Sequence, residues 1–200
     1  MARRLRGLPT SGTSVTPARC GRRHRCRTAD RAGQPGHRVQ HHAGVLEAIV
    51  EALAQEPINV IVAIGRNVDP ARFGTPPRNV RLEAYVDQPL VLERCDAFVT
   101  HGGFNSVKEA AILGVPMVVV PITADQPYSA QRCAARGIGR TIAPDNRTPA
   151  AMHEAVRAVL DNGAYRRSAQ AFQAEMTALP GLGELVRTLE STARSRASVS

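Results

Sequence analysis

A chain of 200 residues is long enough for one domain with a buried core and short for two. No apolar run approaches the roughly 20 residues that a membrane span requires, which argues against stable membrane insertion. The basic start is not followed by the apolar stretch of a secretory signal. The four cysteines suggest no disulfide framework, so a reducing, cytoplasmic location is expected.

The formal net charge of +9 lies entirely at one end of the chain. Residues 1–42 contain ten arginines and one aspartate, whereas residues 43–200 contain 16 basic and 16 acidic side chains. A basic patch is the usual electrostatic signature of a nucleic-acid-binding protein. Here that alternative depends on residues 1–42 alone, and the neutral remainder favours a partner other than nucleic acid.

Residues 1–42 are rich in Arg, Gly, Pro, His and Thr and lack apolar periodicity. This composition is typical of a disordered basic arm. A zinc site is a weaker alternative, because no standard ligand spacing is matched by Cys20, His24, Cys26, His41 and His42. A third hypothesis is that this segment is a translation in the wrong reading frame.

The genetic code is compatible with this third hypothesis. Residues 33–41, GQPGHRVQH, can be encoded so that the same bases, read one position later, give Ala-Ser-Leu-Gly-Thr-Val-Phe-Asn. Residues 30–32 permit Ile-Val-Leu in that frame, which would place a strand and a turn ahead of the helix expected near Ala43. The 25 arginines against one lysine indicate a GC-rich gene, in which displaced frames stay open over long distances. We therefore prefer the frame-shift interpretation of residues 1–42.

From Ala43 onwards, apolar segments of strand and helix length alternate. Helices are expected over residues 43–55, 89–94, 105–113, 126–136, 149–160 and 164–179, with a final short helix after residues 181–183. Strands are expected over residues 59–65, 79–82, 97–100, 116–121 and 140–142. This alternation predicts an α/β domain over residues 43–190, with a Rossmann-like parallel sheet covered by helices on both faces. Residues 191–200 are expected to be a frayed tail.

One of these strands ends in His101-Gly102-Gly103, directly before a helix. Ligands of open parallel sheets bind beyond the carboxyl ends of the strands, and glycines there let a ligand approach the backbone closely. The free N–H groups and the dipole of the following helix favour a phosphate. Asn105 and Ser106 add side-chain donors, and His101 can donate to a phosphate oxygen. The sequence therefore predicts an anion site at this turn.

Carboxylates and amides near the same sheet edge suit the hydroxyl groups of a sugar. Glu109 lies one helical turn after Asn105 and can accept two hydrogen bonds from the vicinal diol of a ribose. Asp125 and Gln126 follow the next strand, so they lie at the same edge. Each residue separately has a structural explanation, such as an N-cap for Asp125. Their joint occurrence at two successive strand ends favours a ligand site.

The combined pattern resembles the nucleotide-sugar-binding signature of family 1 glycosyltransferases, most closely those of the bacterial macrolide and antibiotic type. Its parts are H-G-G-F-N-S-x-x-E from residue 101, G-V-P-M-x-x-x-P from residue 114 and D-Q-P-x-x-A from residue 125. The likeness covers about residues 43–189 and implies the C-terminal, donor-binding half of a two-domain GT-B fold. The displaced-frame Ser-Leu-Gly-Thr also matches the first strand of that half, in support of the frame-shift hypothesis.

The resemblance implies a role for each residue of the predicted site. It assigns the donor's phosphates to His101, Gly102, Gly103, Asn105 and Ser106, the ribose to Glu109, and the transferred sugar to Asp125 and Gln126. The family's base-stacking segment, aromatic-x-Pro-Gln, corresponds to residues 85–88, so Tyr85 and Gln88 are the implied base contacts. Asp87 stands where the family has proline.

The reaction implied by the resemblance is an inverting, metal-independent transfer from a UDP- or dTDP-sugar to a small hydrophobic acceptor, such as an antibiotic or polyketide, without a cofactor. The departing diphosphate is stabilised by the helix N-terminus and His101. The general base belongs to the family's N-terminal domain, so we expect no catalytic base and no transfer activity in these 200 residues alone. The main alternative is the donor-binding subunit of a split glycosyltransferase. An NAD-binding enzyme is disfavoured because no G-x-G-x-x-G follows an early strand.

Overall fold

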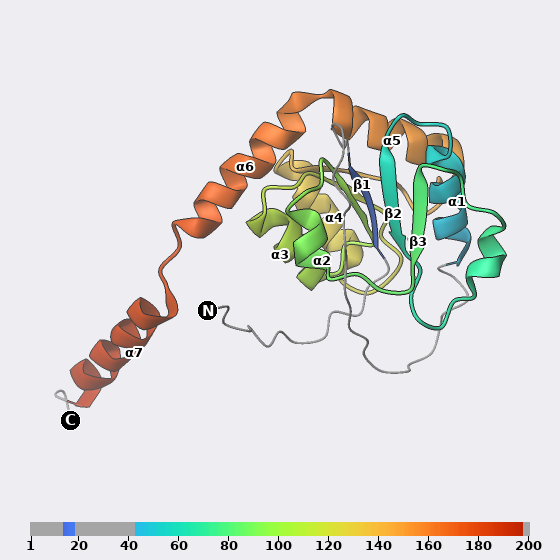
Figure 1. Cartoon of the computed structure of the whole chain (residues 1–200). Helices are drawn as coiled ribbons and strands as arrows, with labels where there is room; N and C mark the ends of the chain where they lie inside the picture. Colours follow the sequence, from blue (N-terminus) through green and yellow to red (C-terminus); the bar gives the residue numbers. More distant parts are fainter. Residues whose placement is uncertain (1–13, 19–42, 198–200) are drawn as a thin grey trace.

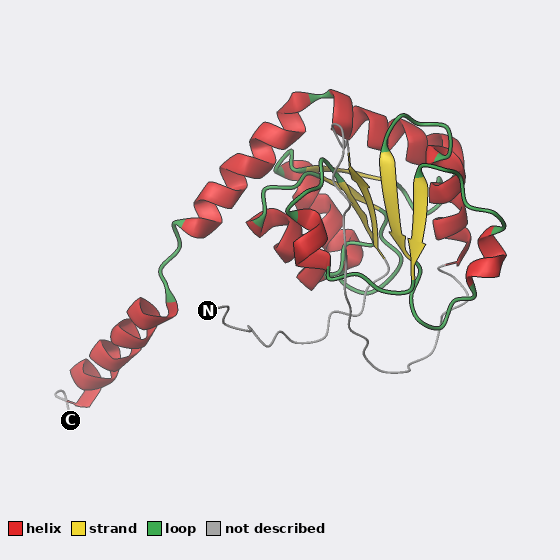
Figure 2. Cartoon of the chain, in the orientation of Figure 1, coloured by secondary structure: helices red, strands yellow, loops and turns green. Residues whose placement is uncertain are grey.

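The computed structural model describes residues 14–18 and 43–197, which form one six-stranded sheet between two layers of helices (Figures 1 and 2). The strand order is β3-β2-β1-β4-β5-β6. The strands are β1 (Ser14–Ala18), β2 (Asn59–Ala63), β3 (Val80–Glu83), β4 (Phe98–Thr100), β5 (Met117–Val119) and β6 (Gly139–Thr141). All strands except β1 run in the same direction. The expected α/β class and Rossmann-like sheet are confirmed.

Strand β1 departs from the expected parallel sheet. It lies between β2 and β4 and is antiparallel to both. The interpretation of all of residues 1–42 as a disordered arm is therefore wrong for residues 14–18, because the backbone groups of β2 and β4 require a strand between them. Pro17 lies opposite Val60 and has no N–H to donate, which is unusual for a central strand. The remainder of the segment, including the candidate zinc ligands, lies outside the described residues.

The helices follow the expected positions closely. They are α1 (Ala43–Leu53), α2 (Gln88–Leu92), α3 (Phe104–Ile112), α4 (Gln126–Ala135), α5 (Pro149–Asp161), α6 (Gly163–Thr177) and α7 (Leu182–Ala197), with a 3-10 turn at Pro70–Phe73. Side-chain caps explain two of the starts, since Thr148 accepts a hydrogen bond from Ala151 N and Asn162 accepts one from Ala164 N.

The C-terminal helix is longer than the expected short one. Helix α7 reaches Ala197, so the prediction of a frayed tail is wrong for residues 191–197. After Gly183 the sequence contains no glycine or proline up to the end of the helix, and Glu190 pairs with Arg194 one turn later at 3.6 Å. Figure 1 shows α7 standing away from the sheet, beyond the end of α6.

Side chains of the inner strands β2, β4 and β5 alternate between two separate cores. In β5, Val118 belongs to the core formed with α1 and α5, whereas Met117 and Val119 belong to the core formed with α2, α3, α4 and α6. All three side chains are fully buried. Both faces of the sheet are thus covered, and the strand ends are the places where a ligand can reach the sheet. No helix within residues 43–197 has both the length and the apolar character needed to cross a membrane.

Candidate functional site

The turn between β4 and α3, residues 101–103 (the α3 turn), has a backbone that requires glycine at its second position. Gly102 has a φ of +86°, and a Cβ at this position would lie 2.6 Å from Val119 Cγ1 and 3.4 Å from the carbonyl oxygen of Gln126. The Gly102 N–H donates to Thr100 Oγ1 at 3.2 Å. The turn is therefore packed directly against β5 and the start of α4, which brings two of the predicted segments together.

The imidazole of His101 lies against the next glycine. A Cβ on Gly103 would be 2.5 Å from His101 Nε2, so the ring occupies the space that a side chain would need. His101 is half-buried, and Gly103 has an extended backbone that other residues can also adopt. The second glycine is therefore explained by the imidazole rather than by its own backbone conformation.

Helix α3 begins at this turn without a side-chain cap. Gly103 is its N-cap residue and contributes no side-chain hydrogen bond, so the first-turn N–H groups have no acceptor from a capping side chain. Asn105 is exposed, whereas Ser106 is only 4% exposed. Asn105 is thus better placed than the Ser106 hydroxyl to reach a ligand. The open helix end, with His101 beside it, is suited to an anion.

The predicted base and ribose contacts are in direct contact with each other. Gln88 Nε2 donates a hydrogen bond to Glu109 Oε2 at 2.7 Å, and Gln88 is only 7% exposed. Burial raises the pKa of the Glu109 carboxyl above its usual value of 4.5, an effect that the hydrogen bond from Gln88 and the charge of Lys108 oppose and that Asp87 reinforces. The hydrogen bond holds one carboxylate oxygen and leaves the other available to a ligand.

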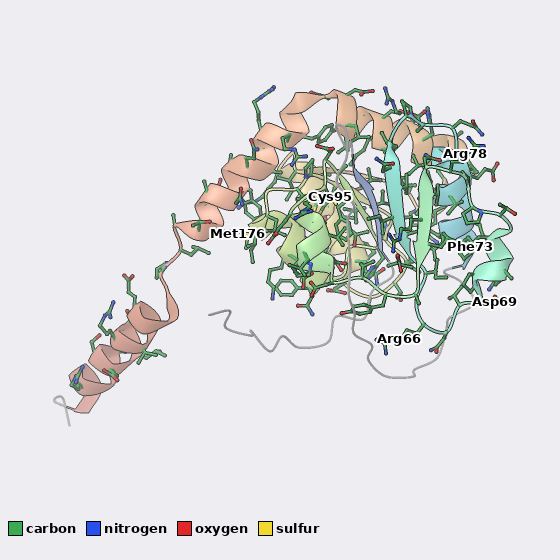
Figure 3. All side chains as sticks on the ribbon, viewed as in Figure 1. Arg66, Asp69, Phe73, Arg78, Cys95 and Met176 are labelled. Carbon is green, nitrogen blue, oxygen red and sulfur yellow. The ribbon has the colours of Figure 1, made fainter. Side chains whose placement is uncertain are left out.

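Tyr85 lies beside a cation that the sequence did not single out. The guanidinium of Arg66 is 5.5 Å from the centre of the Tyr85 ring, a cation–π distance. Arg66 follows β2 and Tyr85 follows β3, two adjacent parallel strands, so both lie at the carboxyl edge of the sheet. Figure 3 labels Arg66 on the loop that leaves β2. Because Arg66 directly follows the strand expected over residues 59–65, its position could have identified it as a residue of the carboxyl edge.

Asp87 has a structural role. It is the N-cap residue of α2, where its side chain accepts a hydrogen bond from Leu90 N at 3.4 Å. The residue that replaces the family's proline therefore still starts the helix that carries Gln88. Tyr85 and Gln88 therefore still lie at the carboxyl edge of the sheet despite this substitution.

The β5–α4 turn, residues 120–125, and the first residue of α4 hold the predicted sugar contacts, Asp125 and Gln126. Gln126 Oε1 accepts hydrogen bonds from Ile122 N at 2.7 Å and Thr123 N at 2.9 Å, so its side chain closes the turn and leaves Nε2 as its remaining donor group. Asp125 is exposed and makes no cap hydrogen bond, so capping does not explain it. Ala124 has a φ of +56°, in the region that glycine favours.

Arg147, in the loop before α5, contacts the β5–α4 turn. Arg147 Nη2 donates a hydrogen bond to the carbonyl oxygen of Pro121 at 2.5 Å. Nothing in the sequence pattern predicted this contact, because Arg147 lies in a loop without periodicity and its partner is 26 residues away.

Other reactive groups in the described residues lie outside this edge. His153 Nε2 in α5 lies 2.6 Å from Glu56 Oε1 and joins the helix to the segment after α1. Cys95 and Cys133 are buried thiols; Cys95 Sγ donates to the Val91 carbonyl oxygen at 2.9 Å, and burial raises the pKa of the Cys133 thiol to about 11. Across residues 14–18 and 43–197, no group of three His, Cys, Asp or Glu side chains could hold a metal ion.

A shallow hollow of about 490 Å³ lies beside the edge strand β3. Its lining includes Pro70, Gly74 and Leu82, and the 3-10 turn with Asp69 and Phe73 that borders it is labelled in Figure 3. None of its lining residues belongs to the predicted site.

Comparison with known protein families gives a match over most of the chain. The model of the family "Erythromycin biosynthesis protein CIII-like, C-terminal domain" matches residues 47–192. NDP-glycosyltransferase YjiC of Bacillus licheniformis is 36% identical over 107 residues, which cover 54% of this chain and 27% of that protein. Tylactone mycaminosyltransferase of Streptomyces fradiae is 31% identical over 201 residues, which cover 93% of this chain and 41% of that protein.

Solved structures show the same relationship. The glycotransferase of kitacinnamycin has a TM-score of 0.71 and 31% identity, with 86% of this chain and 47% of that chain covered. Glycosyltransferase VinC, solved in complex with dTDP, has a TM-score of 0.66 and 30% identity, with 74% and 37% covered. The chain thus spans less than half the length of each of these four proteins.

Proposed function

Because the chain belongs to the erythromycin biosynthesis protein CIII-like C-terminal domain family of antibiotic-type glycosyltransferases, we propose that it binds a nucleotide-sugar donor at the α3 turn. Its fold is that of the C-terminal half of a GT-B glycosyltransferase. The observation that carries the proposal is the uncapped start of α3 with the His101 imidazole packed against Gly103. Unpaired amides and an imidazole at one helix end form a site for a diphosphate.

The other parts of the donor follow from the arrangement around this turn. The diphosphate lies against the backbone of Gly102 and Gly103, with His101, Asn105 and Ser106 in the same turn. Because the Gly102 N–H already donates to Thr100 Oγ1, the amides that bind it are those of Gly103 and the first turn of α3. The ribose diol donates to the free oxygen of Glu109, which Gln88 holds in place. The base stacks beside Tyr85, and the transferred sugar faces the β5–α4 turn with Asp125 and Gln126. This order places the donor along the carboxyl edge from β3 to β5.

The donor is a nucleoside diphosphate sugar of the uridine or thymidine class. The dTDP complex of VinC supports a thymidine nucleotide, and the name of the Bacillus licheniformis relative refers to an NDP-sugar without specifying the base. The donor is a substrate, and the proposed reaction uses no resident cofactor.

The chemistry at the α3 turn concerns the leaving group. In the proposed inverting transfer, an acceptor oxygen attacks the anomeric carbon, and the bond from that carbon to the diphosphate oxygen breaks with its electron pair kept by the diphosphate. The amides of α3 and His101 stabilise this developing charge without the need for a metal ion. The acceptor's hydroxyl proton goes to a general base. We assign that base to an N-terminal acceptor domain outside these 200 residues.

The acceptor is proposed to be a small hydrophobic aglycone of the antibiotic or polyketide type. Its main contacts are expected in the N-terminal domain, which is either covalently continuous with this chain or carried by a separate chain of a split enzyme. In both cases the 200 residues alone bind donor without transferring sugar. Transfer to a small aglycone by the purified chain alone would contradict this part of the proposal.

Calorimetric titration tests donor binding directly. The ligands are dTDP, dTDP-glucose, UDP and UDP-glucose, and the variant is His101→Ala. Loss of a charge-assisted hydrogen bond costs about 1.5–3 kcal/mol, so the affinity of His101→Ala should fall roughly 10- to 100-fold. His153→Ala, in helix α5 outside the site, is the matched control and should bind as the wild type does. A folded wild-type chain that binds none of the four ligands would refute the proposal.

A further inference from the structure

The conformation of the β5–α4 turn is held from two sides. At its carboxyl end, the buried side chain of Gln126 accepts hydrogen bonds from Ile122 N and Thr123 N. At its amino end, the carbonyl of Pro121 accepts a hydrogen bond from Arg147 Nη2 at 2.5 Å. Between these two ends, Ala124 adopts a positive φ of 56°, which an alanine keeps only where its surroundings impose it. The hydrogen bonds of Gln126 and Arg147 therefore maintain the conformation of this turn.

As a charged arginine, Arg147 is an unusual choice for a hydrogen bond to the neutral carbonyl of Pro121. Its side chain is partly buried, and its Nε is buried without a hydrogen-bond acceptor. Within the described part of the chain, no carboxylate lies within ion-pair distance of Arg147. Partial burial of a guanidinium without a counter-charge lowers stability, so the hydrogen bond of Arg147 to a neutral carbonyl is not explained by stability alone.

The location of the contact relates it to the donor. Pro121 lies two residues beyond the end of β5, and the residue between them, Val120, donates its N–H to Thr100 O at 2.8 Å. Thr100 precedes His101, so the carbonyl that Arg147 holds lies one strand away from the proposed diphosphate site. Asp125 and the free Nε2 of Gln126 lie on the turn whose amino end is fixed by this hydrogen bond.

We propose that Arg147 is a positioning residue for the sugar subsite. Its hydrogen bond to the Pro121 carbonyl holds the β5–α4 turn so that Asp125 and Gln126 face the transferred sugar. The inference rests on the proposed donor site. It also separates two parts of that site, because the nucleotide is bound by α3 and its neighbours, whereas the sugar is bound by the turn that Arg147 holds. Arg147 should therefore affect the affinity for a sugar nucleotide more than the affinity for the bare nucleotide.

The test compares dTDP with dTDP-glucose by calorimetry on the full chain, with UDP and UDP-glucose as a second pair. The variants are Arg147→Gln, which removes the cation, and Arg147→Lys, which keeps a charge and a donor. Arg132→Gln, on the exposed surface of α4, is the matched control. Wild type should bind the sugar nucleotide more tightly than the bare nucleotide. Arg147→Gln should lose about tenfold in affinity for the sugar nucleotide and less than about twofold for the bare nucleotide.

Hydrogen exchange of residues 121–126 gives an independent readout. In the wild type, the sugar nucleotide should slow amide exchange in this turn more than the bare nucleotide does, and this difference should vanish in Arg147→Gln. Arg147→Lys should keep part of this difference in exchange. If Arg147→Gln does not fold, Arg147→Lys is the variant on which the comparison is made. Equal losses of affinity for both ligands, or unchanged affinity for both, would overturn the positioning role. A wild type that binds neither ligand would instead refute the donor site itself, and a wild type that binds both equally would refute the sugar subsite.

Discussion

Gln88 Nε2 donates a hydrogen bond to Glu109 Oε2 at 2.7 Å and so connects the first residue of α2 with the second turn of α3. The two residues belong to different strand–helix units and lie 21 residues apart in the chain. A carboxylate that is partly buried requires such a donor, and the hydrogen bond also fixes the direction of its second oxygen. The proposed base and ribose contacts therefore act as one unit.

Replacing Gln88 by leucine tests this unit. The variant Gln88→Leu keeps the size of the buried side chain but leaves Glu109 without its donor, so the carboxylate is free to rotate away from the ribose. We expect about a tenfold loss of affinity for dTDP and a similar loss for dTDP-glucose, measured by calorimetry. Gln131→Leu, at an exposed position of α4, is the control. A loss confined to the sugar nucleotide would contradict the assignment of Gln88 to the nucleotide part of the site.

The pKa of Glu109 predicts a pH-dependent effect on stability. Because burial raises this pKa in the folded chain, the folded state holds the proton more tightly than the unfolded state does. The resulting stabilisation is fully present below the ordinary value of 4.5 and is lost as the pH rises through the raised pKa. Glu109→Gln, which imitates the protonated form, should therefore melt at a higher temperature than the wild type at pH 7.

The advantage of Glu109→Gln should shrink as the pH is lowered, because the wild-type carboxyl then becomes protonated as well. Thermal unfolding followed by circular dichroism over a pH series measures it. Glu51→Gln, on the exposed side of α1, should show no such trend. At pH 7 the same Glu109→Gln variant should bind dTDP more weakly, because the amide accepts the ribose hydrogen bonds less well than a carboxylate. An advantage that is the same at every pH would contradict the cause given for the shift.

The two glycines of the α3 turn should respond differently to alanine. At Gly102 the φ of +86° and the 2.6 Å approach to Val119 Cγ1 both oppose a side chain, so Gly102→Ala should destabilise the fold by about 1–3 kcal/mol. At Gly103 the backbone accepts alanine, and the new methyl group would displace the His101 imidazole. Gly103→Ala should therefore unfold near the wild-type temperature yet lose about as much donor affinity as His101→Ala.

Denaturant unfolding and calorimetry on this pair of variants separate stability from binding. If Gly103→Ala bound dTDP as tightly as the wild type does, the claim that Gly103 makes room for a donor-binding His101 imidazole would be wrong. If Gly102→Ala were as stable as the wild type, the reason given for the first glycine would be wrong.

Much of the fold follows from local patterns in the sequence. The apolar segments that became β2 and β5, the glycines before α3 and the Thr148 cap of α5 depend on neighbours within a few residues. The positions of His101, Gly102 and Glu109 at one edge also follow, because parallel strands end on the same side of a sheet. These features could be predicted because the physical cause and the residue lie close together in the chain.

The features that escaped prediction depend on distant partners. Arg147 and Arg66 lie in loops, and only the folded sheet brings them to Pro121 and Tyr85. Strand β1 was missed because SVTPA contains a proline and only one strongly strand-forming apolar residue, Val15. Its place in the sheet is set by the space between β2 and β4. Helix α7 was underestimated because its polar surface resembles that of a frayed tail.

The reading frame of residues 1–42 remains a proposal that DNA sequence can test. The antiparallel β1 with Pro17 in a central position favours a displaced frame, because a parallel strand ahead of α1 would suit that position better. One observation opposes the proposal: the alignment with the Streptomyces fradiae protein covers 93% of the chain and so extends into residues 1–42 as they are translated. We expect that one single-base correction in the gene restores a strand followed by Ser-Leu-Gly-Thr before Ala43. A verified gene sequence in which no such correction exists would exclude the proposal.

The central claim is that a diphosphate binds the backbone amides at the start of α3, and NMR titration of the ¹⁵N-labelled chain with dTDP tests it most directly. The largest amide shifts should fall on residues 102–106, with the His101 imidazole resonances moving at the same ligand concentration. Shifts confined to the hollow beside β3, or no shifts in a chain shown to be folded, would contradict the account.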